Sequence, residues 1–200
     1  MPESDCILDI ENGILRSGRI VAGVDEAGRG CLAGPVVAGA VILDETRPIR
    51  GLRDSKTLSE KKRNELFEQI REKALAYSVG MTAAEEIDRI NILQAALLAM
   101  EKAVLSLRKK PVCILIDGNS KTSLPIEQKA IVKGDSKCAS IAAASIVAKV
   151  TRDRIMTEIE REYPGYGFSR HKGYPTKEHL GALRNLGPCP IHRKSFKGVL

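Results

Sequence analysis

Hydrophobic and polar positions divide the chain into short strand-like runs and longer stretches at helical spacing. Apolar runs at 19–24 and 35–43 flank the glycine-rich segment 27–30, which predicts a β-hairpin. A third strand is expected over 76–81. The continuous apolar run at 112–116 is typical of a strand buried on both faces, and another strand is expected over 129–132.

The segments between these strands carry apolar residues at helical spacing. A capping-box pattern at 57–60 begins a helix that runs to about residue 73, and a second at 82–85 begins one long helix that ends near residue 109. An alanine-rich helix starts at about residue 140 and stops at Tyr163-Pro164-Gly165. A short helix is expected over 176–185.

This order of elements predicts the fold class. Strands and helices alternate after the hairpin, so we expect an α/β layered domain whose mixed sheet joins an antiparallel hairpin to parallel crossovers. A chain of 200 residues suits one domain, with a core at about 18–162 and a C-terminal helical and basic segment at about 163–200.

Composition argues against membrane-spanning and secreted classes. No apolar run approaches the roughly 18 residues that a membrane span needs. The first twelve residues carry four acids, the wrong charge for a secretory signal, so we expect a cytoplasmic protein. The five cysteines are widely spaced and lack zinc-ligand spacing, so we expect reduced thiols, with Cys113 in the core.

Positive charge gathers in the last quarter of the chain. Lysines and arginines number 32 against 25 acids, a net charge of +7, which suits an anionic partner such as nucleic acid. A solvated basic surface is the alternative interpretation. The basic residues in question are Arg152, Arg154, Arg170, Lys172, Lys177, Arg184, Arg193, Lys194 and Lys197.

Three aspartates, Asp25, Asp117 and Asp135, each stand at the C-terminal end of a predicted strand, the edge of an α/β sheet where ligands bind. Clustered carboxylates repel one another unless a cation neutralises them, and oxygen ligands select hard ions such as Mg²⁺ or Mn²⁺. Glu26 follows Asp25 directly and reaches the same site if the chain bends there. Two cations about 3.5–4 Å apart could then support phosphodiester cleavage.

Each of these acids also has an ordinary explanation. An isolated aspartate at a strand end is more often a turn residue or a helix cap, and it is the joint placement at one predicted edge that favours a site. The segment 23–30 lacks the Gly-Lys-Ser/Thr ending of a phosphate loop. The histidines, His171, His179 and His192, show no metal-ligand spacing, and we expect surface or capping roles for them.

Five sequence blocks carry a resemblance to a known family. The segment Gly23-Val24-Asp25-Glu26-Ala27-Gly28-Arg29-Gly30 resembles the signature of the prokaryotic ribonuclease HII enzymes. The later blocks follow in that family's order, so the resemblance spans roughly residues 21–196. They are Asp54-Ser55-Lys56-Thr57-Leu58-Ser59, Ile116-Asp117-Gly118-Asn119, Lys133-Gly134-Asp135 with 140–153, and Tyr166-Gly167-Phe168 with His171-Lys172-Gly173-Tyr174.

The resemblance implies a fold and a reaction. The fold would be ribonuclease H-like, with a small C-terminal helical segment. The reaction would be endonucleolytic hydrolysis of the RNA strand of RNA–DNA hybrids, and incision 5′ of single ribonucleotides embedded in duplex DNA, as in ribonucleotide excision repair. The products would carry 3′-hydroxyl and 5′-phosphate ends, and two Mn²⁺ or Mg²⁺ ions would be required.

The resemblance also assigns roles to residues. Asp25, Glu26, Asp117 and Asp135 would be the catalytic metal ligands, and Asp153 matches a further acid in a supporting role. Substrate would be bound by the segment Gly28-Arg29-Gly30, by Lys56 at a phosphate, and by Tyr174 beside the sugar. Recognition of the 2′-hydroxyl is how a protein distinguishes RNA from DNA.

Two rival functions stay open at the level of sequence. One is another enzyme on a similar scaffold, such as a resolvase-like or phosphotransfer protein, since fold alone does not decide function. The other is a non-catalytic nucleic-acid-binding module, although clustered acids would weaken its affinity for phosphates. We expect a monomer that binds RNA–DNA hybrids and ribonucleotide-containing DNA, and no membrane.

Overall fold

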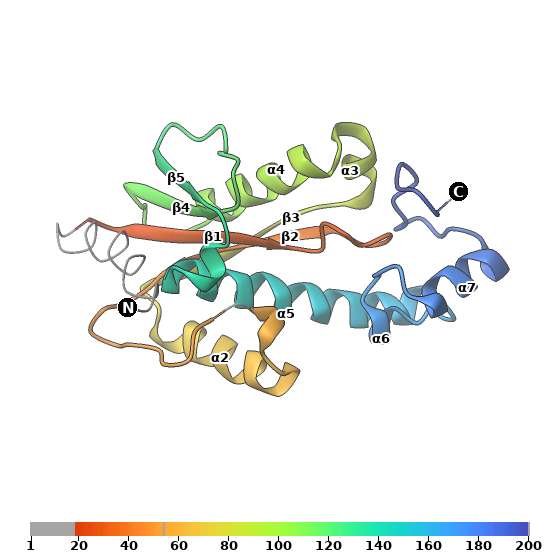
Figure 1. Ribbon diagram of the computed structural model, residues 1–200, viewed down its shortest axis with the longest axis horizontal. Helices are drawn as coiled ribbons and strands as arrows, with labels where there is room; N and C mark the ends of the chain where they lie inside the picture. The colour runs from red at the N-terminus through yellow and green to blue at the C-terminus, as the bar shows by residue number, and fades with distance from the viewer. Residues whose placement is uncertain (1–18, 54, 200) are drawn as a thin grey trace, which may run out of the picture.

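The computed structural model describes residues 19–53 and 55–199, which form a mixed five-stranded sheet with helices on both faces (Figure 1). The strand order is β3-β2-β1-β4-β5. The elements are β1 (Val21–Ala27), β2 (Val36–Ile42), η1 (Ser55–Thr57), α2 (Glu60–Lys73), β3 (Ala76–Thr82), α3 (Ala84–Ile90), α4 (Ile92–Leu105), β4 (Cys113–Asp117), β5 (Glu127–Ile131), η2 (Gly134–Ser136), α5 (Ala139–Glu162), α6 (Phe168–His171) and α7 (Lys177–Leu186).

The predicted hairpin is confirmed, with one change in its length. β1 and β2 pair antiparallel from Gly23↔Val41 to Ala27↔Val37, and residues 28–35 connect them. The sequence pattern ended the first strand at Asp25, but the pairing continues for two more residues because Glu26 and Ala27 face Ala38 and Val37 of β2. Asp25 therefore lies inside the strand and is held by its ladder.

Parallel pairing joins the hairpin to the second half of the sheet. β4 runs parallel to β1, and β5 runs parallel to β4, as the predicted crossovers require. Cys113, Ile114, Leu115 and Ile116 of β4 are fully buried, in agreement with a strand covered on both faces. The parallel arrangement places the C-terminal ends of β1 and β4 at the same edge of the sheet.

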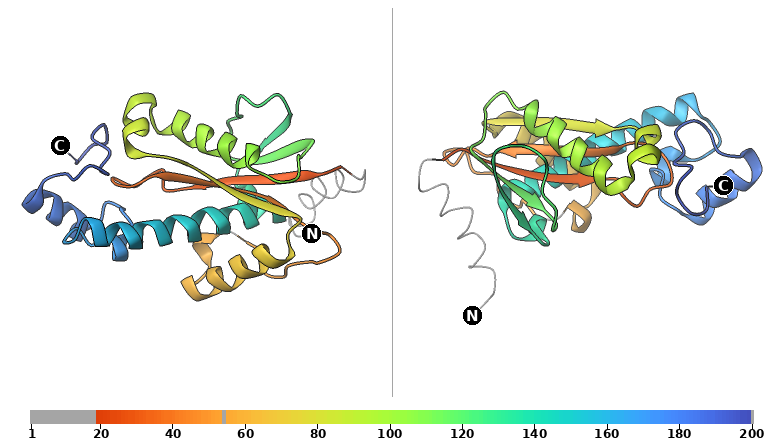
Figure 2. Two further views of the ribbon diagram at one scale, coloured as in Figure 1. Left: turned by 180° about the vertical axis from the view of Figure 1, so that it is seen from behind. Right: turned by 90° about the horizontal axis from the view of Figure 1, so that it is seen from above.

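Helices α2 and α5 cover one face of the sheet, and α3 and α4 cover the other (Figures 1 and 2). The alanine-rich start of α5 packs directly on β1. A Cβ atom added at Gly23 would lie 2.1 Å from the backbone of Ser140, so only glycine allows this close approach. The small residues on both sides thus let the helix lie against the strand that carries Asp25.

The prediction of one long helix after residue 82 was wrong. The chain forms two helices, α3 and α4, separated at Asn91, whose φ of 69° is left-handed. The Asn91 side chain accepts hydrogen bonds from the amides of Leu93 and Gln94, so it caps α4. The positive φ interrupts the helical run, and local capping by Asn91 outweighs the continuous apolar periodicity.

Neither predicted capping box forms as expected. The cap of α2 is Ser59, whose hydroxyl accepts from the amide of Lys62, two residues beyond the predicted cap Thr57. The cap position of α3 is Ala83, which has no side-chain acceptor, and Thr82 stays in β3. Strand pairing with β2 holds Thr82, because Thr82 faces Val36.

The C-terminal segment, with α6 and α7, packs beside the far end of α5 and the 28–35 connection (Figure 1). Two of the residues expected on a basic surface are fully buried there, Arg152 and Arg193. That part of the prediction was wrong. Cys31, Cys113, Cys138 and Cys189 are buried and form no disulfide, as expected of reduced thiols, and Cys6 lies outside the described residues. Within the described ranges, the structure contains no helix long and apolar enough to cross a membrane.

Candidate active site

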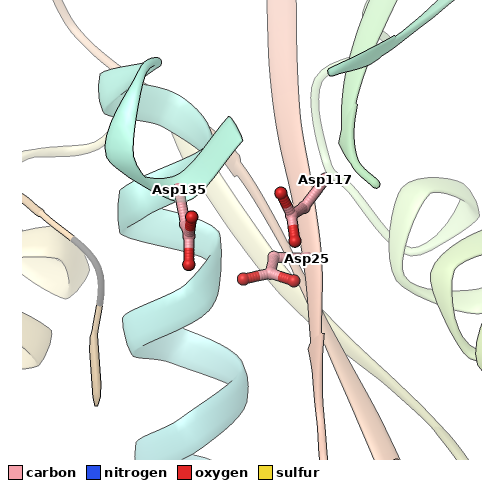
Figure 3. Close-up of side chains that lie close together, drawn as sticks. All are labelled: Asp25, Asp117 and Asp135. Carbon is pink, nitrogen blue, oxygen red and sulfur yellow. The ribbon is translucent and has the colours of Figure 1, made fainter. Parts of the chain in front are cut away.

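Asp25, Asp117 and Asp135 form an acidic cluster on the α5 side of the sheet (Figure 3). One carboxylate oxygen from each residue lies within 4.8 Å of the others. Asp25 and Asp135 are buried, with 4% and 6% of their surfaces exposed, and Asp117 is partly buried. The three residues come from β1, β4 and η2, which are separated by long stretches of sequence.

The sheet register explains why two of these acids meet. The pairing of β1 with β4 runs to Val24↔Ile116, so Asp25 and Asp117 follow the last matched pair on neighbouring parallel strands. Side chains alternate between the faces of a strand, and Val21 and Leu115 pack with Ile141 of α5. Asp25 and Asp117 therefore project from the same face as these residues. Asp135 lies in η2, not at a strand end as the sequence suggested.

Backbone amides hold two of the carboxylates. Asp117 Oδ1 accepts a hydrogen bond of 2.6 Å from the amide of Gly134, and Asp25 Oδ1 accepts one of 2.6 Å from the amide of Glu26. Burial raises the pKa of Asp25 well above its usual range, and the charges of Glu26 and Asp117 raise it further. Hydrogen bonds from Glu26 and Ser145 oppose this rise in pKa. The ionised cluster is therefore costly without a counter-charge.

The cluster fits a divalent cation. Its donors are carboxylate oxygens, the ligands that Mg²⁺ and Mn²⁺ prefer. A cation among three buried or half-buried acids also offsets the repulsion and desolvation that raise the pKa of Asp25. Both the chemistry of the donors and the electrostatics of the site favour a hard metal ion.

Glu26 is placed differently from the three aspartates. The ladder between β1 and β2 runs without interruption through Asp25↔Gly39 and Glu26↔Ala38, so the pleat directs these two side chains to opposite faces. The expected bend at this point is absent from the ladder. The Glu26 carboxylate instead accepts from Arg29 Nη1 at 3.1 Å, while its charge still acts on Asp25.

Lys56 approaches the cluster from η1. Its ammonium lies 3.7 Å from Asp135 Oδ2, and 76% of its side chain is exposed. Such a long, solvated pair contributes little to stability. Asp54, which belongs to the same sequence block, lies outside the described residues.

Tyr174 and the Gly28-Arg29-Gly30 segment lie next to each other. Leu32, in the connection that follows this segment, donates its amide to Gly173 O at 2.8 Å, and the Tyr174 hydroxyl interacts with the thiol of Cys31. Tyr174 as a whole residue is 39% exposed, and the ammonium of Lys149 of α5 lies over its ring, 5.3 Å from the ring centre. Burial of the hydroxyl raises the pKa of Tyr174.

Helix α5 connects the region around Tyr174 to the acidic cluster. Ser145, whose side chain helps to lower the pKa of Asp25, and Lys149, which lies over Tyr174, are four residues apart on one face of the helix. That spacing is about 6 Å along the helix axis. Asp153 lies one turn further and pairs with Lys149 at 2.9 Å, so it sets the position of the lysine above the tyrosine.

Sequence reasoning missed three buried groups around the site. Ser145 shares a 2.7 Å hydrogen bond with Ser55 as well as its contact with Asp25. Arg152 donates to the carbonyls of Pro35, Ala33 and Lys172. Arg193 donates to the carbonyls of Gly34 and Arg29. The only available signal was the position of Ser145 and Arg152 within the apolar run of a helix.

The histidines form a fourth missed group. His171, His179 and His192 are buried and packed together, with exposures of 8%, 0% and 1%, so the expected surface or capping roles were wrong. We call these three residues the histidine cluster. They meet because α6, α7 and the segment after residue 189 fold around Phe168, which contacts all three rings.

Known proteins are similar to this chain along most of its length. A ribonuclease HII of Albidiferax ferrireducens is 59% identical over 180 residues, which cover 90% of this chain and 87% of the relative. The crystal structure of ribonuclease H2 from Pyrococcus horikoshii superposes with a TM-score of 0.75 at 31% identity, covering 90% of this chain and 94% of the other. The structure of the PCNA:ribonuclease HII complex from Archaeoglobus fulgidus superposes with a TM-score of 0.68 at 29% identity, covering 89% of this chain and 95% of the other.

The family model described as ribonuclease HII matches residues 22–199, which include the acidic cluster, Tyr174 and the histidine cluster. The structural likeness agrees with the predicted ribonuclease H-like fold. The chain belongs to the ribonuclease HII family and is an endoribonuclease that acts on the RNA of RNA–DNA hybrids.

Proposed function

We propose that this enzyme also incises duplex DNA 5′ of a single embedded ribonucleotide, leaving 3′-hydroxyl and 5′-phosphate ends. The observation that carries the proposal is the acidic cluster, whose three carboxylates converge within 4.8 Å of one another. Asp25, Asp117 and Asp135 would hold divalent Mg²⁺ or Mn²⁺, with Glu26 as a fourth ligand. Two such ions can activate a water molecule and stabilise a leaving oxygen.

The protein groups have separate tasks in this proposal. Asp117 is kept in place by the amide of Gly134, and Asp25 by the amide of Glu26, so neither carboxylate needs to reorganise when a cation binds. Glu26 acts on Asp25 through its charge. To serve as a ligand it must break its ion pair with the exposed Arg29, and the chain must bend locally so that its carboxylate reaches the face of the sheet that carries Asp25. Asp153 acts through Lys149, which it positions above Tyr174.

Substrate recognition is assigned to the segment Gly28-Arg29-Gly30, to Lys56 and to Tyr174. Gly30 has open space around its Cα, so a sugar can approach the backbone amides there and hydrogen-bond them through its 2′-hydroxyl. Tyr174 offers a partly exposed ring face to the neighbouring sugar. Lys56 can exchange its solvated pair with Asp135 for a substrate phosphate.

The test is incision of a labelled DNA duplex that contains one ribonucleotide, with Mg²⁺, Mn²⁺ or EDTA. We expect metal-dependent cleavage 5′ of the ribonucleotide by the wild type and its loss in Asp117→Asn. Glu72→Gln, which changes a largely exposed acid on α2, is the matched control and should cleave normally. An intact strand from folded wild-type protein under every metal condition would refute the proposal, and an all-DNA duplex serves as substrate control.

A further inference from the structure

The histidine cluster contacts the backbone on both sides of the Tyr174 amide. His179 Nδ1 lies 3.0 Å from the carbonyl oxygen of Tyr174, and His171 Nδ1 lies 3.1 Å from the amide nitrogen of Gly173. His192 does not contact this segment. Its Nε2 atom lies 3.0 Å from the Nε2 atom of His179. The buried rings therefore form a connected path that ends on the main chain of Tyr174.

The backbone partners determine which nitrogen of each ring carries hydrogen. A backbone amide can only donate, so Nδ1 of His192, 3.0 Å from the amide of Cys189, must accept. The longer approach of 3.3 Å to the Cys189 carbonyl leaves this unchanged, because a hydrogen on Nδ1 would face the amide hydrogen. The hydrogen of the neutral His192 ring is then on Nε2, and it points at His179.

The same reasoning assigns the hydrogen position on His179. His192 donates from Nε2, so His179 must accept at its own Nε2 and carry its hydrogen on Nδ1. That Nδ1–H donates to the carbonyl of Tyr174. The hydrogen position on His171 follows independently, because its Nδ1 accepts from the amide of Gly173 and its Nε2 donates to the carbonyl of Tyr166 at 2.7 Å.

We propose that His192 and His179 are positioning residues for the cleavage reaction, holding Tyr174 through a relay of two neutral imidazoles. This inference rests on the proposed function, which gives Tyr174 its place beside the sugar. The relay has one direction, from the amide of Cys189 through His192 and His179 to the carbonyl of Tyr174. It works only when each ring has one donor and one acceptor.

The surroundings favour the neutral rings that the relay needs. Burial lowers the pKa of His179 and lowers that of His192 to about 4. The charged or titratable groups that face the two rings include His171, Glu178 of α7 and the Cys189 thiol, with the Tyr166 ring against His192. Glu85 and Asp88 of α3, and Lys194, line the same pocket as His192. A proton added to Nε2 of His179 would face the Nε2–H of His192 at 3.0 Å, and a proton added to Nδ1 of His192 would face the amide hydrogen of Cys189 at 3.0 Å.

The first test is the hydrogen position on each ring, read by ¹⁵N NMR of the histidine-labelled enzyme near neutral pH. We expect the Nδ1–H form for His179 and the Nε2–H form for His171 and His192. A His179 ring that carries its hydrogen on Nε2, or that is charged, would overturn the relay. This test uses the wild type alone and does not depend on the reaction, so it separates the relay from the proposed function.

The second test measures incision kinetics on the duplex with one ribonucleotide. His192→Phe keeps the ring volume but cannot donate, so we expect kcat to fall about tenfold or more with KM nearly unchanged, because misplacement by about 1 Å at a reacting centre can cost a hundredfold. His192→Gln, whose amide nitrogen can replace Nε2 as donor, should recover most of the loss. Equal losses in both variants would contradict a role for the hydrogen bond.

A double-mutant cycle with Tyr174→Ala then shows whether the histidine acts through the tyrosine. In the Tyr174→Ala background, His192→Phe should change kcat by less than about twofold, because coupled residues are not additive. Additive losses would overturn the positioning role, and so would a Tyr174→Ala enzyme that cleaves like the wild type. A wild type that does not incise this duplex would refute the proposed function instead, with the relay still decided by the NMR measurement.

Discussion

The carboxylate of Asp117 accepts a 2.6 Å hydrogen bond from the backbone amide of Gly134, seventeen residues later in the chain. Gly134 begins η2, and the next residue is Asp135. This contact therefore ties the end of β4 to the turn that carries the third acid of the cluster. The position of Asp135 relative to Asp117 depends on a carboxylate oxygen that must also remain available to a cation.

Asp117 variants should separate this structural contact from the charge. Asp117→Asn keeps an acceptor for the Gly134 amide and removes one of three repelling charges. We expect its Tm in EDTA to rise by about 2–4 °C, the shift that roughly 1 kcal/mol produces in a chain of this size. Asp117→Ala removes the acceptor as well, so its Tm in EDTA should be lower than that of Asp117→Asn.

The measurement is thermal unfolding with EDTA and with added Mg²⁺ or Mn²⁺. Wild-type Tm should rise with metal, since a ligand that binds only the folded state stabilises it, and Asp117→Asn should respond less. An equal metal response in the two proteins would argue against Asp117 as a ligand. Glu72→Gln should behave as the wild type does.

Gly28 and Gly30 should respond differently to alanine. Gly28 has a φ of +96°, and a Cβ there would lie 2.0 Å from the buried Arg152 side chain, whereas a Cβ at Gly30 meets nothing within 4 Å. We expect Gly28→Ala to lower the free energy of unfolding by about 1–3 kcal/mol and Gly30→Ala to leave it within about 0.5 kcal/mol of the wild type. Urea denaturation measures both values.

The Gly30 variant then provides a clean test of substrate approach. Because its fold should be intact, a fall in incision by Gly30→Ala reports on crowding at the substrate. Unchanged cleavage of the single-ribonucleotide duplex by stable Gly30→Ala protein would remove Gly30 from the proposed binding surface.

Arg193 should not tolerate lysine. Its guanidinium donates three hydrogen bonds to the carbonyls of Gly34 and Arg29, and a lysine ammonium lacks the planar fork that reaches them together. We expect Arg193→Lys to lose about 2–4 kcal/mol of stability, because buried carbonyls are left without donors. Arg184→Lys on the exposed side of α7 is the matched control and should unfold as the wild type does in urea.

The histidine cluster should make the fold sensitive to acid. The folded-state pKa of His192 is lowered to about 4 by burial, against 6.5 for the free side chain. Above pH 6.5 neither state binds the proton, so the contribution is fully present there. As the pH falls from 6.5 towards 4, the unfolded chain is protonated first, and up to about 3 kcal/mol of stability is lost.

Urea denaturation across this pH window checks the prediction. His192→Gln has no group that titrates at this position, so its stability should fall less steeply than that of the wild type between about pH 6.5 and pH 4.5. Parallel pH profiles for the two proteins would show that His192 does not contribute. Carboxylates elsewhere titrate equally in both and cancel in the comparison.

The alternation of apolar runs was enough to predict the hairpin, the buried strand β4, helix α5 and the order of elements. These features depend on local periodicity and on which side chains must be buried away from water, and both can be read from consecutive residues of the sequence. The acids at 25, 117 and 135 were found in the same way, as polar residues that interrupt or follow apolar runs. The break at Asn91 was missed, because a cap formed by one side chain leaves no trace in hydrophobic periodicity.

The amino-acid sequence by itself determined the strands, the main helices and the identity of the acids. Only the tertiary structure decided that Glu26 faces away from Asp25, that Arg152 and Arg193 are buried, and that three histidines meet. The buried arginines satisfy their donors on carbonyls 119 and 159 residues away, and His179 meets His192 across two segments. A buried polar group is stable only where such partners exist, and their positions are fixed by the packing of the whole chain, not by neighbouring residues.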